Sequence, residues 1–361
     1  MTSHIAFRQE SRQNKRELIG IKTENFNRWG ITMTIRFGII GTNWITESFI
    51  TAAQQIEEFS LTAVYSRTAE KGENFAKRYG AEHVFTDLKA MAESDCLDAV
   101  YIASPNSLHA EQSILFLNNK KHVLCEKAMA SNVKEVKKVI AAAKDNEVLF
   151  MEALKTTLLP NFQAIQNNIH KVGKVRRAFA SYCQYSSRYD AYKEGNVLNA
   201  FKPEFSNGAL MDIGVYCIYP MVVLFGKPSA VTASSYLLET GVDGEGSIIM
   251  SYSDMDIVIM YSKITNSYVP SEIQGEDGNI LLDQMNTPQK VEIHYRNGQK
   301  EDITELQKAE AMYYEAKEFI GLIQAGQIES AVNSYDVSLT VMEIMEEVRK
   351  QTGITFPADV R

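Results

Sequence analysis

Residues 35–51 read IRFGIIGTNWITESFIT, and this stretch decides the fold. The β-branched run Ile35–Ile40 predicts a strand that ends at Gly41. After a tight turn, apolar residues recur at helical spacing at Ile45, Phe49 and Ala52. Strand, turn and helix in this order are typical of the opening unit of a doubly wound sheet. In such a unit the glycine permits the sharp turn, and the first N–H groups of the helix point at a ligand, usually a pyrophosphate.

The turn departs from the dinucleotide fingerprint G-x-G-x-x-G, because Gly41, Asn43 and Thr46 occupy its three glycine positions. Asn tolerates a left-handed backbone better than most residues, so the turn can persist at Asn43. Two interpretations of Asn43 stay open: its side chain hydrogen-bonds the pyrophosphate, or it only shapes the turn. Taken alone, the stretch fits an ordinary strand-to-helix turn equally well.

Length and composition narrow the class of protein. A chain of 361 residues with 45% hydrophobic and 23% charged residues predicts a globular protein of two domains. A net charge of -8 without a basic stripe argues against nucleic acid as a partner. No apolar run approaches the roughly 20 residues that span a bilayer, so we expect no membrane association. The four cysteines form no C-x-x-C pair, which predicts reduced thiols and a cytoplasmic location.

The first 32 residues precede the opening strand and contain no apolar segment of the kind a secretory signal needs. We therefore interpret residues 1–32 as an N-terminal extension and expect the functional part of the chain to start near Met33.

Strand and helix patterns alternate from the opening unit to about Glu152, with short connections. This alternation predicts a parallel sheet covered by helices on both faces, that is, a Rossmann domain over residues 33–152. Its strands are expected at Ile35–Ile40, Leu61–Tyr65, His83–Phe85, Leu97–Ala103, His122–Cys125 and Val148–Met151.

Beyond Glu152 the pattern changes to strand-like segments separated by turns such as Asn297-Gly298. Residues 153–361 are predicted to form an α+β domain with an open, mainly antiparallel sheet and two terminal helices, near Glu310–Ala325 and Val337–Gln351. An open sheet face is a natural surface for a homo-oligomer. The expected strands are Val175–Tyr185, Ala230–Leu238, Ser247–Tyr252, Asp256–Lys263, Ser271–Gln274 and Val291–Tyr295.

Polar residues follow the second strand, where a dinucleotide fold selects its cofactor. An NAD-preferring fold usually carries Asp or Glu here, to accept a hydrogen bond from the ribose 2′-hydroxyl. This chain instead has Ser66 and Arg67. A hydroxyl followed by a guanidinium suits a 2′-phosphate, so we predict NADP as the cofactor, with NAD as the alternative.

Two further polar segments follow the fourth and fifth strands. The fourth strand leads into Ser104, Asn106 and His109, where helix capping alone would explain Asn106. The fifth strand ends in Glu126 and Lys127, a charged pair directly after a buried apolar run. A lysine at this strand end can donate to an oxygen near a nicotinamide ring.

The segments GIIGTNWI, YSR, ASPNSLH, CEK, MEA and GALMDIGVY occur in this order and spacing. The set resembles the glucose-fructose oxidoreductase, inositol dehydrogenase and rhizopine catabolism (Gfo/Idh/MocA) family, from about Met33 to near the C-terminus. The resemblance implies an NAD(P)-dependent oxidoreductase whose second-domain sheet makes a dimer, with Lys127 as the catalytic lysine. A tyrosine, Tyr216, replaces the histidine of many members, as in the branch containing dimeric dihydrodiol dehydrogenase. In that branch the tyrosine is taken as the acid/base, and the resemblance implies that Asp212 orients the substrate or Tyr216.

Alcohol oxidation fits these residue types, because the hydroxyl proton must leave as the hydride does. A free phenol is a poor base at neutral pH, and an ammonium such as Lys127 is expected to lower the pKa of Tyr216. Asp212 lies one helical turn before Tyr216, so both are expected to face one pocket. Two departures from the family pattern are Ala128, where proline is usual, and Lys155. Lys155 is either a subgroup-specific contact or a polar residue where the chain crosses between domains.

The predicted activity is hydride transfer between a nicotinamide cofactor and a sugar, polyol or cyclic diol. Two alternatives are a non-catalytic dinucleotide-binding regulator and a sugar–sugar oxidoreductase that retains its cofactor. No histidine pair has metal-ligand spacing, so no metal is expected. The predicted cofactor-binding residues are Gly41, Thr42, Asn43, Trp44, Ile45, Ser66, Arg67, Ser104, Asn106, His109, Glu126 and Lys127; the predicted catalytic residues are Lys127, Tyr216 and Asp212.

Overall fold

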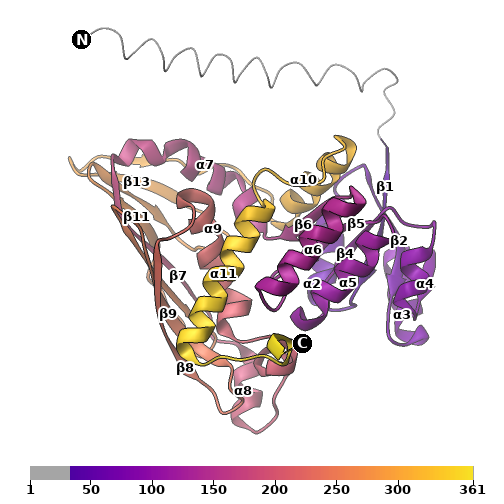
Figure 1. Ribbon diagram of the computed structural model, residues 1–361. Helices are drawn as coiled ribbons and strands as arrows, with labels where there is room; N and C mark the ends of the chain where they lie inside the picture. The colour runs from indigo at the N-terminus through magenta and orange to yellow at the C-terminus, as the bar shows by residue number, and fades with distance from the viewer. Residues whose placement is uncertain (1–32, 361) are drawn as a thin grey trace. The chain divides into compact units, whose positions relative to one another are not determined.

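The first half of the protein is a six-stranded parallel sheet with the strand order β3-β2-β1-β4-β5-β6, seen in a computed structural model that describes residues 33–360 (Figure 1). This order places β1 at the centre, with the chain winding outward in both directions, as the doubly wound prediction requires. The extension assigned to residues 1–32 lies outside the described residues. The strands are β1 (Ile35–Ile40), β2 (Phe59–Tyr65), β3 (His83–Phe85), β4 (Ala99–Ile102), β5 (His122–Glu126) and β6 (Phe150–Ala153).

Helices cover both faces of this sheet, and one of them comes from the far end of the chain. Helix α10 (Met312–Gln324) packs on α2 and buries Phe319 against β1, with ring centroids of Phe319 and Phe37 5.9 Å apart. The apolar core beside the first sheet therefore includes residues beyond 310. The connecting helices are α2 (Trp44–Ala53), α3 (Ala69–Tyr79), α4 (Leu88–Glu93), α5 (Asn106–Asn118) and α6 (Val133–Asn146).

The second half is built on an eight-stranded sheet with the order β14-β13-β12-β11-β7-β10-β9-β8. Neighbouring strands are antiparallel except β7 and β10, which pair in parallel, so the predicted mainly antiparallel sheet is confirmed. The sequence patterns did not indicate β12, β14 and helix α8 (Ser187–Lys193), because these elements have only five, three and seven residues. The strands are β7 (Val175–Cys183), β8 (Ala230–Leu237), β9 (Asp243–Ser251), β10 (Asp256–Ser262), β11 (Ser271–Gly275), β12 (Gly278–Leu282), β13 (Val291–Tyr295) and β14 (Lys300–Asp302).

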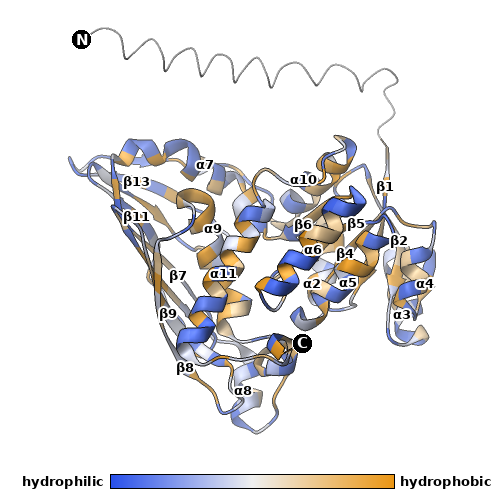
Figure 2. Cartoon of the chain, in the orientation of Figure 1, coloured by the Kyte–Doolittle hydropathy of each residue, from blue (hydrophilic) through white to orange (hydrophobic). Residues whose placement is uncertain are grey.

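Helices α9 (Val215–Phe225) and α11 (Tyr335–Thr352) pack on one face of the second sheet (Figure 1). Along α6 and α11 polar and apolar residues segregate to different sides, as expected for helices with one buried face (Figure 2). The apolar stretch Pro203–Phe225 is long enough to cross a bilayer, contrary to the sequence expectation, but 72% of its most apolar window is buried in the protein. It serves here as a core element.

A π-helical turn, Leu210–Gly214, leads directly into α9 and is fitted closely to the second sheet. Asp243 on β9 accepts a hydrogen bond from the backbone N–H of Leu210 at 2.7 Å. A Cβ at Gly208 would lie 2.2 Å from Oδ1 of Asp243, and Gly208 has a φ of +139°. A Cβ at Gly214 would meet the ring of Tyr261 at 3.2 Å. The two glycines of the GALMDIG motif thus allow the turn that carries Asp212 to lie directly on the sheet.

A buried carboxyl group on β6, at the edge of the first sheet, predicts a pH-dependent stability. Glu152 on β6 is 3% exposed, and burial raises its pKa to about 7, from an ordinary value of ~4.3 in the unfolded chain. The folded state thus binds this proton more tightly than the unfolded chain does. The resulting contribution to the free energy of unfolding is present at low pH and is lost as the pH rises through 7. We expect Glu152→Gln to exceed the wild type in unfolding free energy by ~1–3 kcal/mol at pH 8, and to match it near pH 4.

Urea unfolding at several pH values measures this difference, with Glu111→Gln on the exposed side of α5 as the control. A stability gap between Glu152→Gln and the wild type that stays constant from pH 4 to 8 would contradict the assignment.

Candidate active site

A cavity of about 1030 Å³ opens at the carboxyl ends of β1, β4 and β5, between the first sheet and residues of the second domain. This is the edge at which doubly wound sheets bind their ligands. The predicted site residues that line the cavity are Asn43, Trp44, Ile45, Ser104, Asn106, His109, Glu126, Lys127, Asp212 and Tyr216.

The opening turn is held against the end of β4. A Cβ at Gly41 would lie 2.8 Å from the carbonyl oxygen of Ala103, and the φ of Gly41 is +108°, so only glycine fits. The side chain of Asn43 accepts hydrogen bonds from the N–H groups of Ile45 and Thr46 and donates to the oxygen of Ala103 at 3.1 Å. Asn43 is therefore the N-cap of α2, which supports the interpretation that it shapes the turn.

The segment after β4 links the two halves of the protein. The amide of Asn106 donates to the oxygen of Ser206 at 3.0 Å and to Oδ1 of Asn207 at 3.1 Å, and it does not cap α5 as the sequence suggested. His109 is buried, with its ring nitrogens 2.8 Å from the oxygen of Ala128 and 2.7 Å from that of Ser104. His109 therefore lies between two backbone carbonyls of the cavity wall, and its neutral ring donates to one of them through its single N–H.

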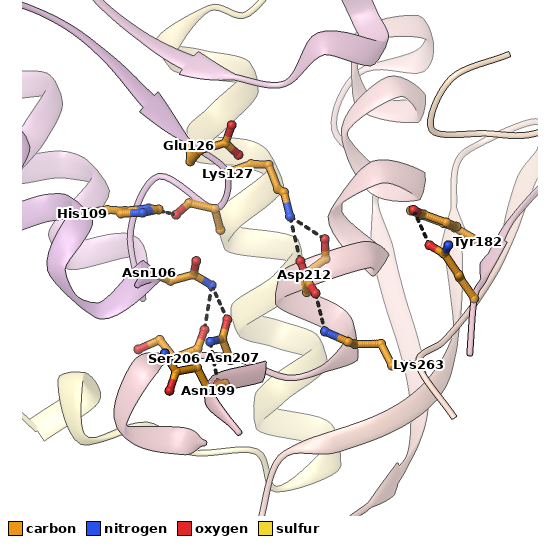
Figure 3. A network of polar contacts seen from close by, with 12 residues as sticks. Asn106, His109, Glu126, Lys127, Tyr182, Asn199, Ser206, Asn207, Asp212 and Lys263 are labelled. Carbon is orange, nitrogen blue, oxygen red and sulfur yellow. Dashed lines mark hydrogen bonds and ion pairs between the residues drawn. The ribbon is translucent and has the colours of Figure 1, made fainter. Parts of the chain in front are cut away.

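Lys127 and Asp212 form an ion pair at the wall of the cavity, and a second lysine joins them (Figure 3). The Nζ of Lys127 donates to Oδ1 and to the backbone oxygen of Asp212, each at 2.8 Å. Lys263, which directly follows β10, donates to the other carboxylate oxygen. Burial raises the pKa of Asp212, but the two ammonium groups outweigh burial, and the net pKa lies well below its usual range. The contacts with Asp212 thus orient the side chain of Lys127, although Ala128 stands where proline is usual.

Tyr216 on α9 lies beside this ion pair. The Nζ of Lys127 is 5.0 Å from the centroid of the Tyr216 ring, and that of Lys155 is 6.0 Å away. Burial raises the pKa of Tyr216 above its usual value, and Lys127 acts in the opposite direction. Lys127 lowers the pKa of Tyr216 as expected, but desolvation has the larger effect. The net pKa is therefore raised, and the expected net lowering is wrong. Tyr216 is a neutral phenol at neutral pH here, suited to donating a proton.

A cluster of buried acids lies behind Lys127. Tyr101 donates to Oε1 of Glu126 at 2.5 Å, and burial raises the pKa of Glu126 although Lys127 opposes the rise. Glu315 on α10 is 1% exposed, and burial together with the charge of Glu126 raises its pKa well above the usual range. Burial thus acts against the charged form of both carboxyl groups, and the charge of Lys127 favours the charged form of Glu126.

Four predicted cofactor residues do not line the cavity, namely Gly41, Thr42, Ser66 and Arg67. Gly41 and Thr42 form the turn itself. Tyr65 pairs with Ile40 in the sheet, so Ser66 and Arg67 lie at the same sheet edge as the turn. Ser66 is buried, whereas Arg67 is exposed and makes no hydrogen bond or ion pair within residues 33–360. Its guanidinium is accessible to a ligand that extends past the turn.

Sequence reasoning missed several residues of the second domain that line or support the cavity. Lys263 was assigned only to a strand end, because nothing near it in the chain indicates an ion pair with Asp212. Tyr182 packs edge-on to Tyr216, with ring centroids 5.7 Å apart, and donates to Gln184 at 3.1 Å. The remaining missed polar residues that the second domain contributes to the wall are Arg188, Asn199, Asn207, Asn286, Thr287 and Glu310.

Two family models match most of the chain. The model of the oxidoreductase family with an NAD-binding Rossmann fold matches residues 35–154, and that of the GFO/IDH/MocA C-terminal domain matches residues 163–281. The chain belongs to the Gfo/Idh/MocA family. The resemblance drawn from the sequence motifs is thereby confirmed, and the protein is an NAD(P)-dependent oxidoreductase acting on CH–OH groups.

Among characterised members of the Gfo/Idh/MocA family, the chain is 59% identical over 325 residues to the NADP(+)-dependent scyllo-inositol 2-dehydrogenase IolU of Bacillus subtilis. The match covers 90% of this chain and 99% of that protein. The trans-1,2-dihydrobenzene-1,2-diol dehydrogenase of Danio rerio is 29% identical, with 91% and 99% coverage. The resemblance to the dihydrodiol dehydrogenase branch is thus confirmed.

A solved structure has the same fold as this chain. It is a 3-ketoreductase from Actinomadura kijaniata in complex with NADP and TDP-benzene, with a TM-score of 0.79 at 22% identity. The match covers 88% of this chain and 98% of the other.

Proposed function

We propose that the protein is an NADP(H)-preferring dehydrogenase of a cyclic polyol, with scyllo-inositol or a stereoisomer as the substrate. The observation that carries the proposal is the placement of Lys127, Asp212 and Tyr216 together on one wall of the cavity. The 59% identity to an NADP(+)-dependent scyllo-inositol 2-dehydrogenase supports the choice of cofactor and substrate.

The residues of the cavity fit a dinucleotide. The turn at Gly41 leaves no side chain between β1 and β4, α2 starts at the cavity, and Trp44 stands 65% exposed at its rim as a surface for stacking. Asn43, Ser104 and Glu126 offer polar groups along the wall. When bound, the nicotinamide ring supplies the acceptor or donor of the hydride.

The protein's own residues handle the proton and the substrate oxygen. In ketone reduction, Tyr216 donates its phenolic proton to the oxygen as negative charge develops there. The ammonium of Lys127 stabilises that oxygen and, afterwards, the phenolate. Asp212 holds Lys127 through two contacts of 2.8 Å, so the ammonium does not need to reorganise during the reaction. In alcohol oxidation the same steps run in reverse, with the phenolate as the base.

The substrate end of the cavity suits a polyhydroxylated ring. Its wall carries the side chains of Gln184, Asn199, Asn207, Asn286 and Thr287. Carboxamides and hydroxyls donate and accept hydrogen bonds, as do the hydroxyl groups of a polyol. Lys155 and Arg188 add donors, of which Lys155 lies on the Tyr216 side.

Turnover measurements test the proposed function. Purified protein is assayed with NADP(+) and with NAD(+) against inositol stereoisomers, aldoses and cyclic diols. We expect the highest kcat/KM with an inositol and NADP(+). Absence of turnover with every polyol, despite tight NADPH binding, would instead support a non-catalytic regulator. Nucleotide that co-purifies and is reduced by one sugar and reoxidised by another would support the sugar–sugar oxidoreductase.

Arg67→Ala should separate the two cofactors. Arg67 is exposed and lies two residues beyond Tyr65, the partner of Ile40 in the sheet. Its guanidinium can therefore bind a 2′-phosphate. We expect the substitution to weaken NADPH binding by ~10- to 100-fold, the range for one charge-assisted contact. Affinity for NADH, which lacks the phosphate, should change less than about twofold. Fluorescence titration measures both affinities, and equal weakening of the two would refute the assignment.

We also propose a cytoplasmic homodimer that pairs through the second sheet. On the face opposite α9 and α11, the cross-strand neighbours Ile249, Val258 and Phe179 form an apolar row across β9, β10 and β7, and Ile249 is 44% exposed. An uncovered apolar row of this kind favours pairing with a second copy. Sedimentation equilibrium tests the dimer, and a monomer at micromolar concentration would refute it.

A further inference from the structure

Lys263 is a buried charge without a role in the reaction described so far. Its side chain is 5% exposed, and its ammonium donates to the Asp212 oxygen that Lys127 leaves free (Figure 3). Burying a lysine costs free energy unless its charge is compensated, so such a residue needs a specific partner. Asp212 already has a charged partner in Lys127. A neutral side chain at position 263 would therefore avoid the free-energy cost of burying a second lysine.

Lys263 is held by hydrogen bonds of its backbone and by contacts of its ammonium. The N–H of Lys263 donates to the oxygen of Gly244 at 2.9 Å, and its carbonyl accepts from the N–H of Ser186 at 2.9 Å. The ammonium lies 5.4 Å from the centroid of the Phe201 ring. Among acidic groups it faces Asp212 at hydrogen-bond distance and Asp243 at longer range. The contact with Asp212 thus fixes the second oxygen of that carboxylate from the sheet side.

The charges of Lys127, Lys263 and Asp212 sum to one net positive charge. Lys127 and Asp212 alone would form a neutral pair, and the carboxylate would cancel the field that Lys127 directs at Tyr216. With Lys263 added, two ammonium groups share one carboxylate, and one positive charge remains at the site. The other groups that face Tyr216 are Lys155, Glu126, Glu315 and Tyr182, of which Glu126 and Glu315 oppose the formation of its phenolate.

We propose that Lys263 is a positioning residue that orients Asp212 and offsets its charge, so that the ammonium of Lys127 keeps its effect on Tyr216 and on the substrate oxygen. This inference rests on the proposed function, because it concerns the same proton transfer. It adds to that function a source for the stabilisation of the phenolate that a buried Tyr216 needs in alcohol oxidation.

The pH profile of kcat/KM in the oxidative direction tests the role of Lys263. Activity rises with pH as Tyr216 ionises, and loss of a positive charge shifts this rise to higher pH. For Lys263→Met we expect a shift of about one pH unit, the lower end of the range for a nearby charge, and a roughly tenfold lower rate on the rising limb. KM for NADP(+) should change less than about twofold, because Lys263 does not line the cavity. Lys263→Arg, which keeps the charge, should restore the profile.

Controls separate this role from a merely structural one. Lys263→Gln provides a second neutral variant if Lys263→Met fails to fold, and it should show the same shift. Lys227→Met breaks an exposed ion pair with Glu343 of 2.6 Å and should leave the profile unchanged. The inference would be overturned if a folded neutral variant showed the pH profile of the wild type, or if Lys263→Arg showed the same shift as Lys263→Met. In either case an active wild type would still support the proposed function. A wild type without polyol turnover would overturn both.

Discussion

Tyr216→Phe should lower kcat by ~10²–10⁴ while the protein still folds and binds NADPH. Removing one oxygen deletes the proton donor and acceptor but keeps the ring that packs against Tyr182, and general acid–base catalysis typically contributes this much. Steady-state kinetics with an inositol in the oxidative direction, and with the matching ketone in the reductive direction, measure the loss. Both directions should lose the same factor, because one group exchanges the proton in each.

Tyr219→Phe is a matched control one turn further along α9. Its hydroxyl lies 2.9 Å from Oγ of Ser338, is buried, and does not reach the cavity. This variant should lose ~1 kcal/mol of stability and keep its kcat. The acid/base assignment fails if Tyr216→Phe turns over within a few-fold of the wild type.

Lys127→Met should lower kcat by ~10²–10³, the usual cost of removing one preorganised donor from a developing oxyanion. It should also change the pH profile. Without the ammonium nearest to the Tyr216 ring, the pKa of Tyr216 rises further above its already raised value, so residual oxidation should require higher pH than in the wild type. Rates measured between pH 6 and 10 show both effects together.

Lys144→Met is the control for this variant, since Lys144 is an exposed lysine 5.4 Å from the ring centroid of Tyr335 and outside the cavity. Its kinetics should match the wild type. A Lys127→Met enzyme with a normal kcat and only a raised KM would mean that the lysine contributes to binding, not to the chemical step.

Much of the fold was predictable because its signals are local. Buried parallel strands such as Ile35–Ile40 are continuous apolar runs, and the polar residues at their carboxyl ends, including Lys127, necessarily gather at one sheet edge. The spacing of Asp212 and Tyr216 likewise predicted that both face one cavity, which they do, although the intervening turn is π-helical.

The remaining features depend on contacts between distant parts of the chain. The ion pair of Lys263 with Asp212 joins residues 51 positions apart, and the bonds of Asn106 to Ser206 and Asn207 join residues at least 100 apart. The net pKa of Tyr216 was predicted in the wrong direction, because a sequence names the charged neighbour but does not give the extent of desolvation. Long-range pairing and burial are properties of the assembled fold.

The packing of α10 on the first sheet has a consequence for how the protein is made. Phe37 and Phe49 belong to the first elements to leave the ribosome, yet Ala316 and Phe319, which belong to the same buried cluster, leave among the last. At the ~5–20 residues per second of synthesis, that apolar face stays uncovered for on the order of ten seconds or more. The nascent nucleotide-binding half therefore needs protection from aggregation until the chain is nearly complete, and an isolated fragment ending near residue 153 would expose the same surface permanently.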